Sequence, residues 1–434
     1  MIGKTRRLAL ALALALAASA AMFAPAAAWA KDDSFTLAVI PDTQNYVDYT
    51  HQKAEGFPFD ARELFFEQMS YIASRLQTNG GDIAFVTSLG DTWQHQTKPF
   101  DEAHAGFGVS KGANPLLDAH FAPTDKVRSV EMPTAKQGFE IIAGKTPFSV
   151  VPGNHDYDAM WTDSRYLPIK DFMNPGDHPR PYGMLHPGGL DNWREVFGAQ
   201  TAFFKDKPWY VASFNGGADS AQIFTAGGYR FLHIGLEMAP SDEVLEWAAK
   251  VIAAHPGLPT IVSTHDHLNT AGERAPNPMV DMAMVHPEHN NPEAVWTKFL
   301  SRHPQIFLAL NGHQHGQAYR ADAGAGGAMV HQVLADYQDR GQTAIAAGVK
   351  AAWPVGIGDG WMRFMTFDMS GETPVIKVRT YSTYYKKFSG ETPEYAAWYR
   401  KVEQPKMSDQ EFLAADDFTI RLEDFRKRFG NGAK

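Results

Sequence analysis

The sequence of 434 residues contains no cysteine. Disulfide bonds and thiolate metal ligands are therefore excluded, so a transition-metal site would need ligands from His, Asp, Glu, Asn or Gln side chains. The fold must then depend on an ordinary hydrophobic core. Hydrophobic residues make up 44% of the chain, which is enough to build one.

After its first 30 residues the sequence has no apolar run long enough to cross a bilayer. The first 30 residues are typical of a signal peptide: a basic start, "KTRR", precedes the apolar residues 8–18, and "AWA" at 28–30 matches a cleavage site. We expect the leader to be removed and the mature protein to be periplasmic or secreted, without a membrane span. A retained anchor is the alternative, and the arginine pair leaves both Sec and twin-arginine export open.

The sequence also has fewer positive than negative charges. It contains 40 Lys and Arg residues and 49 Asp and Glu residues, which gives a formal net charge of −9. The leader carries three of the positive charges, so its removal brings the net charge to −12. This acidic balance argues against binding to duplex nucleic acid. The sequence also lacks a P-loop, which argues against the enzyme classes that depend on it.

Six short apolar runs end at polar residues: "FTLAVI", "DIAFVTS", "PFSVV", "YRFLHIG", "PTIVST" and "QIFLAL". Runs of this length and composition predict buried strands of a largely parallel sheet. Amphipathic helical patterns lie between them, for example residues 61–78 and residues 241–255, where Ser241 is a good N-cap. Strands that alternate with helices predict a layered α/β domain.

One domain is expected over residues 31–388, interrupted by long segments at about 92–146 and 157–228 that would form the walls of a crevice. Three runs after His315, "AMVHQVLADYQ", "WMRFMTFDM" and "PVIKVRTYSTYYKKF", alternate more strongly and predict antiparallel strands of a second sheet. Residues 389–434 are expected to be a C-terminal tail with an amphipathic helix in "DFTIRLEDFRKRF".

Polar side chains that suit metal binding or acid–base chemistry follow five of the apolar runs. In chain order they are Asp42 and Gln44, Asp91, Asn154 with His155 and Asp156, His265, and His313 with His315. Ligands of open α/β sheets bind beyond the carboxyl ends of the strands, so these side chains are expected to converge. Each motif taken singly fits a polar turn or a structural histidine as well as a ligand. The ordered set of oxygen and imidazole groups predicts a pair of divalent or trivalent first-row ions.

This ordered set resembles the calcineurin-like metallophosphoesterases, which are characterised by D-x-H, G-D, G-N-H-[DE], a strand-end His and G-H-x-H. The resemblance covers roughly residues 35–388. The stretches "LADYQ", "GDGWMRFMTFD" and "RTYST" are similar to a bacterial exported subgroup whose first motif reads "PDTQ". The family implies a four-layer αββα sandwich with mixed sheets and a dinuclear metal site at one edge.

The resemblance also implies a role for each motif residue, with seven metal ligands: Asp42, Gln44, Asp91, Asn154, His265, His313 and His315. Asp91 would bridge the two ions. His155 would act as a catalytic residue that stabilises the transition state or protonates the leaving oxygen. Asp156 would either orient His155 or serve a structural role, and His267 is the alternative to His265.

The expected activity is hydrolysis of small-molecule phosphate mono- or diesters by in-line attack of a metal-bridging hydroxide. The two ions would be Mn, Zn, Fe or Mg, with Ca as a further option.

Two departures from the family pattern matter. Gln44 stands where most members have His, and "GDTWQHQ" lacks the Arg of protein phosphatases, which leaves His95, Gln94 or Arg274 to hold phosphate. The alternative function is a catalytically weakened, metal-dependent binding or structural protein on the same fold.

Overall fold

The computed structural model describes residues 33–166, 184–286, 288–350 and 356–430. The expected leader lies outside these residues. Within the described part of the chain, no helix combines the length and apolar character needed to cross a membrane.

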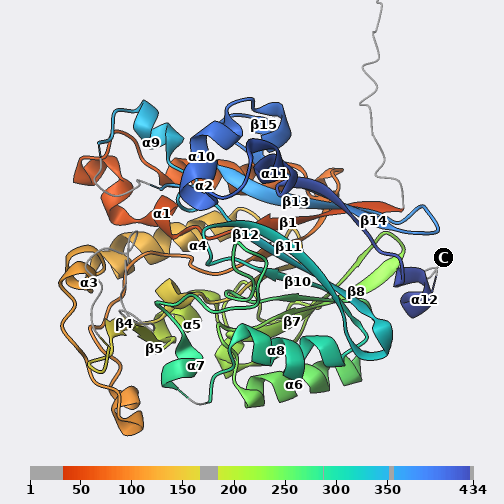
Figure 1. The fold of residues 1–434 in the computed structure, drawn as a ribbon, viewed down its shortest axis with the longest axis horizontal. Coiled ribbons are helices and arrows are strands. Elements are labelled where there is room, and N and C mark those ends of the chain that lie inside the picture. The colour runs from red at the N-terminus through yellow and green to blue at the C-terminus, as the bar shows by residue number, and fades with distance from the viewer. Residues whose placement is uncertain (1–32, 167–183, 287, 351–355, 431–434) are drawn as a thin grey trace, which may run out of the picture.

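Two seven-stranded sheets form the centre of the molecule (Figure 1). The first runs in the order β15 (Lys387–Phe388), β14 (Val375–Ser382), β13 (Trp361–Asp368), β1 (Ser34–Ile40), β2 (Ile83–Ser88), β3 (Phe148–Val150), and β16 (Asp417–Arg421) also pairs with β14. The second runs in the order β11 (Gly316–Ala323), β12 (Met329–Asp336), β10 (Ile306–Asn311), β9 (Thr260–Ser263), β8 (Tyr229–Gly235), β7 (Asp219–Ala226), β6 (Tyr210–Phe214). Both sheets are mixed, as predicted, because parallel and antiparallel pairs occur in each.

The central strands of both sheets are buried on both faces, which explains their continuous apolar runs. Along β1, Phe35, Leu37 and Val39 belong to the cluster between the two sheets. Ala38 and Ile40 alternate with them and belong to the cluster under the helices. This period of two follows from strand geometry, in which successive side chains point to opposite faces.

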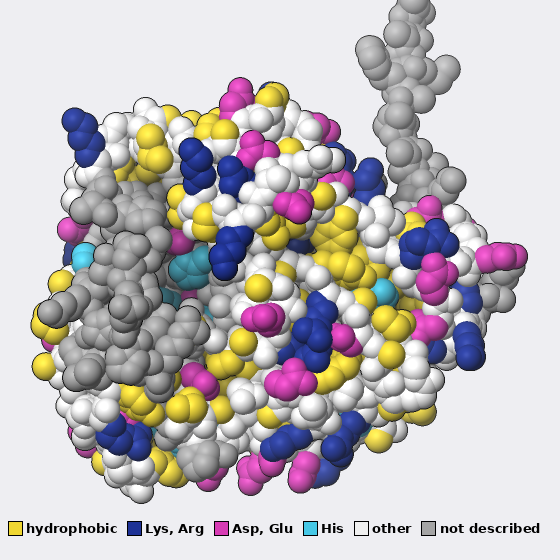
Figure 2. All heavy atoms as spheres, in the orientation of Figure 1, with side chains coloured by type: hydrophobic (Ala, Val, Ile, Leu, Met, Phe, Trp, Pro, Cys, Tyr) yellow, Lys and Arg dark blue, Asp and Glu magenta, His cyan; other side chains and the backbone are white. Residues whose placement is uncertain are grey.

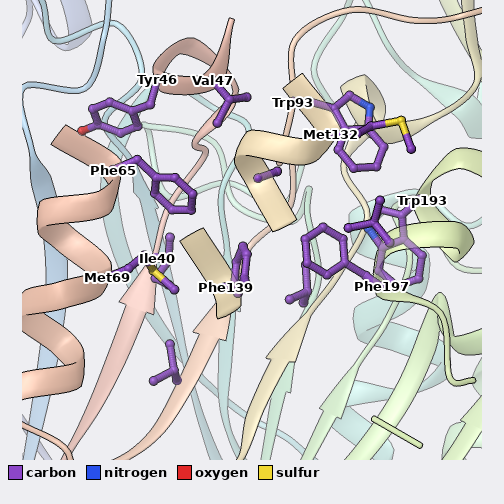
Figure 3. Packing of buried hydrophobic residues seen from close by; sticks show 14 of the residues in the cluster. Ile40, Tyr46, Val47, Phe65, Met69, Trp93, Met132, Phe139, Trp193 and Phe197 are labelled. Carbon is purple, nitrogen blue, oxygen red and sulfur yellow. The ribbon is translucent and has the colours of Figure 1, made fainter. Parts of the chain in front are cut away.

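Helices cover the outer face of each sheet and complete four layers in the order αββα, which confirms the predicted fold class. Figure 3 shows Phe65 and Met69 of α2 (Arg62–Ser74) and Phe139 of α4 (Met132–Glu140) packed near Ile40 of the first sheet. On the other side, α6 (Asp242–Ala254) and α8 (Pro292–Lys298) lie next to each other along the second sheet (Figure 1). The predicted N-cap of α6 is confirmed, because the hydroxyl of Ser241 accepts a hydrogen bond from the backbone N–H of Val244.

Shorter elements connect these layers. They are α1 (Gln44–Val47), α3 (Pro115–His120), β4 (Ala159–Thr162), β5 (Leu185–Gly188), α5 (Asp191–Phe197), α7 (Met282–Val285), α9 (Gln342–Ala346), α10 (Tyr395–Glu403), α11 (Asp409–Ala414) and α12 (Phe425–Phe429). The pair β4 and β5 forms a small antiparallel sheet of its own.

Three sequence predictions about this architecture need correction, the second and third of them only in part. The runs after His315 do not share one sheet: β12 joins the second sheet, whereas β13 and β14 join the first beside β1. The segment 157–228 is not only a wall, because its last part forms β6 and β7 of the second sheet. The segment "DFTIRLEDFRKRF" is strand β16 followed by the short helix α12, since Ile420 and Leu422 alternate into the core beside β14.

Candidate metal centre

The carboxyl ends of five strands meet at one edge of the stacked sheets. Hydrogen bonds join side chains that follow strands of both sheets: the carboxylate of Asp42 accepts from the backbone N–H of His313 at 3.1 Å, and Oδ1 of Asn154 lies 3.1 Å from Nε2 of His265. Nε2 of His265 also lies 3.3 Å from Oδ1 of Asp91. The structure therefore brings together side chains that follow β1, β2, β3, β9 and β10.

The loops at this edge approach one another more closely than most residues allow. A Cβ atom on Gly312 would lie 2.1 Å from Oδ1 of Asp42, and one on Gly153 would lie 2.2 Å from Oδ1 of Asp91. The motif glycines are therefore required by close approach. Left-handed backbone in residues other than glycine is sparsely populated and clusters at functional sites. Three residues of this edge adopt it: Asp91 (φ 52°), His313 (φ 69°) and His315 (φ 47°).

Asp91 lies at the centre of the contacts. Its Oδ1 accepts from the backbone N–H of His155 at 2.9 Å, and its Oδ2 accepts from Nε2 of Gln44 at 3.0 Å. Burial alone would raise the pKa of Asp91, but the imidazoles of His265 and His155 outweigh it and hold the pKa below its usual range. Asp91 is thus a buried carboxylate that stays ionised.

A second buried carboxyl group lies close to Asp91 at this edge. Asp42 is 2% exposed, and burial together with the carboxylate of Asp336 raises the pKa of Asp42 well above its usual range. In the described part of the chain, neither Asp42 nor Asp91 has a Lys or Arg partner. Two buried carboxylates without such a partner favour a bound cation.

His265 is oriented as a metal ligand would be. Its Nδ1 donates to the backbone carbonyl of Leu89 at 2.7 Å, which directs Nε2 at Asp91 and Asn154. Metal-binding histidines almost always donate their other ring N–H in this way. Burial would lower the pKa of His265, but Asp91 and Asp42 raise it to about 10.

Two buried polar atoms of the site have no hydrogen-bond partner. They are Nε2 of His313 and Oε1 of Gln44. Buried side-chain polar atoms nearly always have a partner, so each of these atoms needs an explanation. Asp91, His265 and His313 offer ligand atoms within 4.8 Å of one another, close enough to share a metal ion. The unpaired atoms and this spacing fit an ion in contact with the group.

Three residues at the end of β12 join the site, although the sequence reasoning gave them no role. Asp336 accepts from the backbone N–H of His315 at 2.9 Å, and Asp339 holds Nδ1 of His315 at 2.7 Å. Gln338 accepts from Gln44 at 2.5 Å and lies 3.2 Å from Nε2 of His315. The signal was present in "LADYQD", where polar residues follow an apolar run directly, as in the other motifs.

His155 lies outside this cluster of ligands and borders the cavity. Its Nδ1 donates to the backbone carbonyl of Gln94 at 2.6 Å, and its ring lies edge-on to Phe121 with centroids 5.5 Å apart. The Gln94 carbonyl fixes the tautomer with the proton on Nδ1 in the neutral ring. Nε2 is therefore the nitrogen available for proton transfer.

Asp156 does not orient His155 through a direct contact, which corrects one of its two expected roles. Its Oδ1 accepts from the backbone N–H and the hydroxyl of Thr92, and its Oδ2 accepts from the backbone N–H of Gly153. These bonds tie the loop after β2 to the loop after β3. The position of Asp156 fits the structural alternative.

A cavity of 590 Å³ opens above these residues. Figure 2 shows histidine side chains within a hollow on the left half of the face in view. The polar floor includes Asp91, Asn154 and His313, and the walls include Tyr49 and Phe121. Among the described residues that line it there is neither Lys nor Arg.

The three candidates for holding phosphate lie in different surroundings. Gln94 and His95 border the cavity, as expected. Arg274 does not, because its guanidinium binds Glu293 at 2.8 Å and Asp322 at 2.7 Å. The prediction for Arg274 is therefore not supported by its position.

The choice of His265 over its rival His267 agrees with the geometry. Nε2 of His267 lies 3.0 Å from Oε1 of Gln332, in the network of Arg274 rather than at the strand edge. Burial lowers the pKa of His267 to about 4, so the ring is neutral.

Another buried group, Asp48, His95 and Glu131, also has ligand atoms within 4.8 Å of one another. Here Glu131 is already saturated: it accepts from the backbone N–H groups of Tyr49, Gln94 and His95 and contacts Nδ1 of His95 at 2.8 Å. Because both carboxylate oxygens of Glu131 have protein partners, we interpret this group as a structural brace that holds the loop containing Gln94.

Comparison with known proteins gives little functional guidance. No model of a known protein family matches the chain. The chain is 24% identical over 220 residues to the uncharacterized protein YvnB of Bacillus subtilis (strain 168), an alignment that covers 48% of this chain. The same alignment covers 15% of YvnB, so the chain spans a small part of that relative.

Proposed function

We propose that this protein is an exported, metal-dependent phosphoesterase of the calcineurin-like type. The observation that carries the proposal is the group at the cavity floor: two buried carboxylates, Asp42 and Asp91, face His265 and the unpaired Nε2 of His313. This group is built from strands far apart in the sequence and has no Lys or Arg partner within the described chain. A purely structural role would leave the unpaired Nε2 of His313 and Oε1 of Gln44 without a partner.

The donor set fits two metal ions. Asp42, His315 and Gln44 would hold one ion, Asn154, His265 and His313 the other, and Asp91 would be shared. Such ions supply Lewis acidity and make a water nucleophilic near neutral pH. Oxygen and imidazole ligands without thiolate suit Mn, Zn, Fe or Mg.

The protein itself would position the ester and move a proton. His155 borders the cavity beside the ligand cluster, and its Nδ1–H is fixed by Gln94. With both ring nitrogens protonated, His155 would donate from Nε2 to the transferred phosphoryl group or pass that proton to the leaving oxygen and become the neutral Nδ1–H form. Tyr49 and Phe121 would contact the organic part of the substrate and exclude water from it.

The test is a metal-resolved substrate panel on the mature protein. Bis-p-nitrophenyl phosphate and p-nitrophenyl phosphate are offered with Mn, Zn, Fe, Mg or Ca, beside nucleotide and phospholipid esters. We expect hydrolysis of at least one ester that disappears with a chelator and returns with a specific ion. Bound metal without turnover of any ester would overturn the enzymatic proposal and favour a metal-dependent binding protein.

A further inference from the structure

Four histidines cluster outside the candidate metal centre, where separate segments of the chain meet. They are His104, His186, His286 and His289, called here the histidine cluster. His104 lies in the first long segment and His186 on β5, whereas His286 and His289 follow α7. None of them belongs to the motifs that define the centre at the strand edge.

Three pairs of rings in the histidine cluster have centroid distances close to those of two ligands on one ion. Ring centroids lie 5.6 Å apart for His104 and His286, 4.8 Å for His286 and His289, and 6.0 Å for His104 and His186. Two imidazoles on one tetrahedral zinc ion have centroids roughly 5 Å apart, given a zinc–nitrogen length of about 2 Å.

Three of the rings are held by one nitrogen, so the other nitrogen remains for a ligand bond. Nδ1 of His104 contacts Asp101 at 3.0 Å, Nε2 of His186 contacts Asp163 at 2.9 Å, and Nδ1 of His289 donates to the Ala239 carbonyl at 2.7 Å. A carboxylate or carbonyl on the far nitrogen is the arrangement that orients metal-binding histidines.

The fourth ring supplies an independent indication. His286 is 7% exposed, and its Nδ1 is buried without a hydrogen-bond partner. Burial lowers the pKa of His186 and of His289 to about 4, and burial with the neighbouring His104 lowers the pKa of His286. Neutral imidazoles with free lone pairs are the form that binds a metal.

We propose that His104, His286 and His289, with His186 as a fourth ligand, form a zinc site separate from the centre at the strand edge. Imidazole ligands without oxygen or sulfur donors suit Zn²⁺, and also Ni²⁺ and Cu²⁺. Among the described residues, no three of these rings have ligand atoms within 4.8 Å of one another, so the side chains must move closer together when the ion binds. A bound ion would fix the positions of the chain segments next to Leu185 and Met279. These two residues are joined by a backbone hydrogen bond and line the cavity.

The direct test is anomalous scattering at the zinc edge from crystals of the mature protein grown with micromolar zinc. We expect an anomalous peak between the rings of His104, His286 and His289. This peak is read separately from any peak at Asp91, so failure of one proposal does not decide the other. Absence of a peak among these rings, with zinc seen elsewhere in the same crystals, would overturn the zinc site and leave ring packing with Phe107 and Trp161 as its explanation.

A measurement in solution also tests the proposed zinc site. The double variant His104→Ala, His286→Ala should lose about one zinc ion per chain and most of the thermal stabilisation by zinc, because ion binding and folding are coupled. The matched control is His255→Ala, a histidine at the end of α6. Equal zinc content in the wild type, the double variant and the control would contradict the proposal.

Discussion

His155 is the residue whose surroundings most directly indicate proton transfer. Gln94 fixes its Nδ1, and its other nitrogen is free beside the ligand cluster. We expect His155→Ala to retain the bound metal and to lower kcat by roughly 10²–10⁴-fold, the usual contribution of a general acid. His51→Ala, which removes another histidine from the cavity wall, is the control and should cost far less. Loss of metal from His155→Ala would instead make His155 a ligand.

Gln44 stands where a histidine was expected, and the structure gives it a specific neighbourhood. Its amide nitrogen bonds Asp91 and Gln338, and its oxygen is buried without a partner. Replacing the amide by imidazole in Gln44→His should favour softer ions. We expect roughly a tenfold change in the ratio of zinc- to magnesium-restored activity, within the range that neighbours of metal ligands usually exert. The check is activity after chelation and readdition of single metals; an unchanged ratio would make Gln44 incidental to metal choice.

The brace formed by Glu131 holds a loop in position and is not expected to contact the substrate. Glu131 lies at the start of α4 and holds the loop after β2, whose Gln94 carbonyl orients His155. In Glu131→Gln one oxygen acceptor is lost, so the loop loses hydrogen bonds to a charged group. We expect kcat to fall about tenfold with KM and metal content little changed, a loss consistent with about 1.5 kcal/mol for such a bond.

The control for this brace lies on the same helix. Glu140→Gln removes an exposed carboxylate of α4 that pairs with Lys136 at 3.6 Å. It should leave kcat unchanged. If both substitutions lower kcat equally, or if Glu131→Gln changes KM alone, the account of the loop is wrong.

Strand positions could be predicted from the sequence because both faces of the core strands are buried. The run of β1 is continuous and apolar for that reason, and β2, β3, β8, β9 and β10 follow the same rule. The sheet that each later strand would join could not be predicted, because β13 reaches β1 across more than 300 positions. The helix expected in residues 417–429 is confined to α12, because pairing with β14 makes the first residues of this segment a strand.

The sequence was sufficient to predict which strand-end residues form the site. It was not sufficient to predict the contacts that orient them. Asp42, Asp91 and His313 converge as expected because the strands are parallel and end together. The contact of Gln94 with His155 depends on the path of a loop, which no periodic pattern encodes. Gln338 and Asp339 followed the same strand-end rule; Gln338 ends the quoted stretch "LADYQ", but neither residue was given a role.

The C-terminal segment is part of the molecule's core rather than a tail. Asp416 is fully buried, accepts from the hydroxyl of Tyr337 at 2.9 Å and pairs with Arg340 and Arg363. Burial would raise the pKa of Asp416, but the two guanidinium groups outweigh it and hold the pKa below its usual range. The contribution of Asp416 to the stability of the folded protein is therefore fully present above about pH 4, the usual carboxyl pKa. It is lost as the pH falls through the lowered pKa of Asp416.

Asp416→Asn should thus lower the free energy of unfolding by about 3–5 kcal/mol at pH 7, because it leaves the buried guanidinium of Arg363 without a carboxylate partner and Arg340 with Glu403 alone. Chemical denaturation measures this difference, which should narrow as pH falls below about 4. The matched control is Asp417→Asn, which removes a partly exposed partner of Arg379 and should cost less than about 1 kcal/mol. Equal effects of the two substitutions would contradict the role of Asp416.

The central claim, that Asp91 is shared by two metal ions, is tested most directly by the metal content of the mature protein. Elemental analysis should be run on the wild type and on Asp91→Asn, with Asp191→Asn as an exposed control, and hydrolysis of bis-p-nitrophenyl phosphate followed in parallel. The account predicts that Asp91→Asn loses most of the metal at the strand edge together with essentially all activity, whereas the control keeps both. An Asp91→Asn protein with wild-type metal content and activity would contradict it.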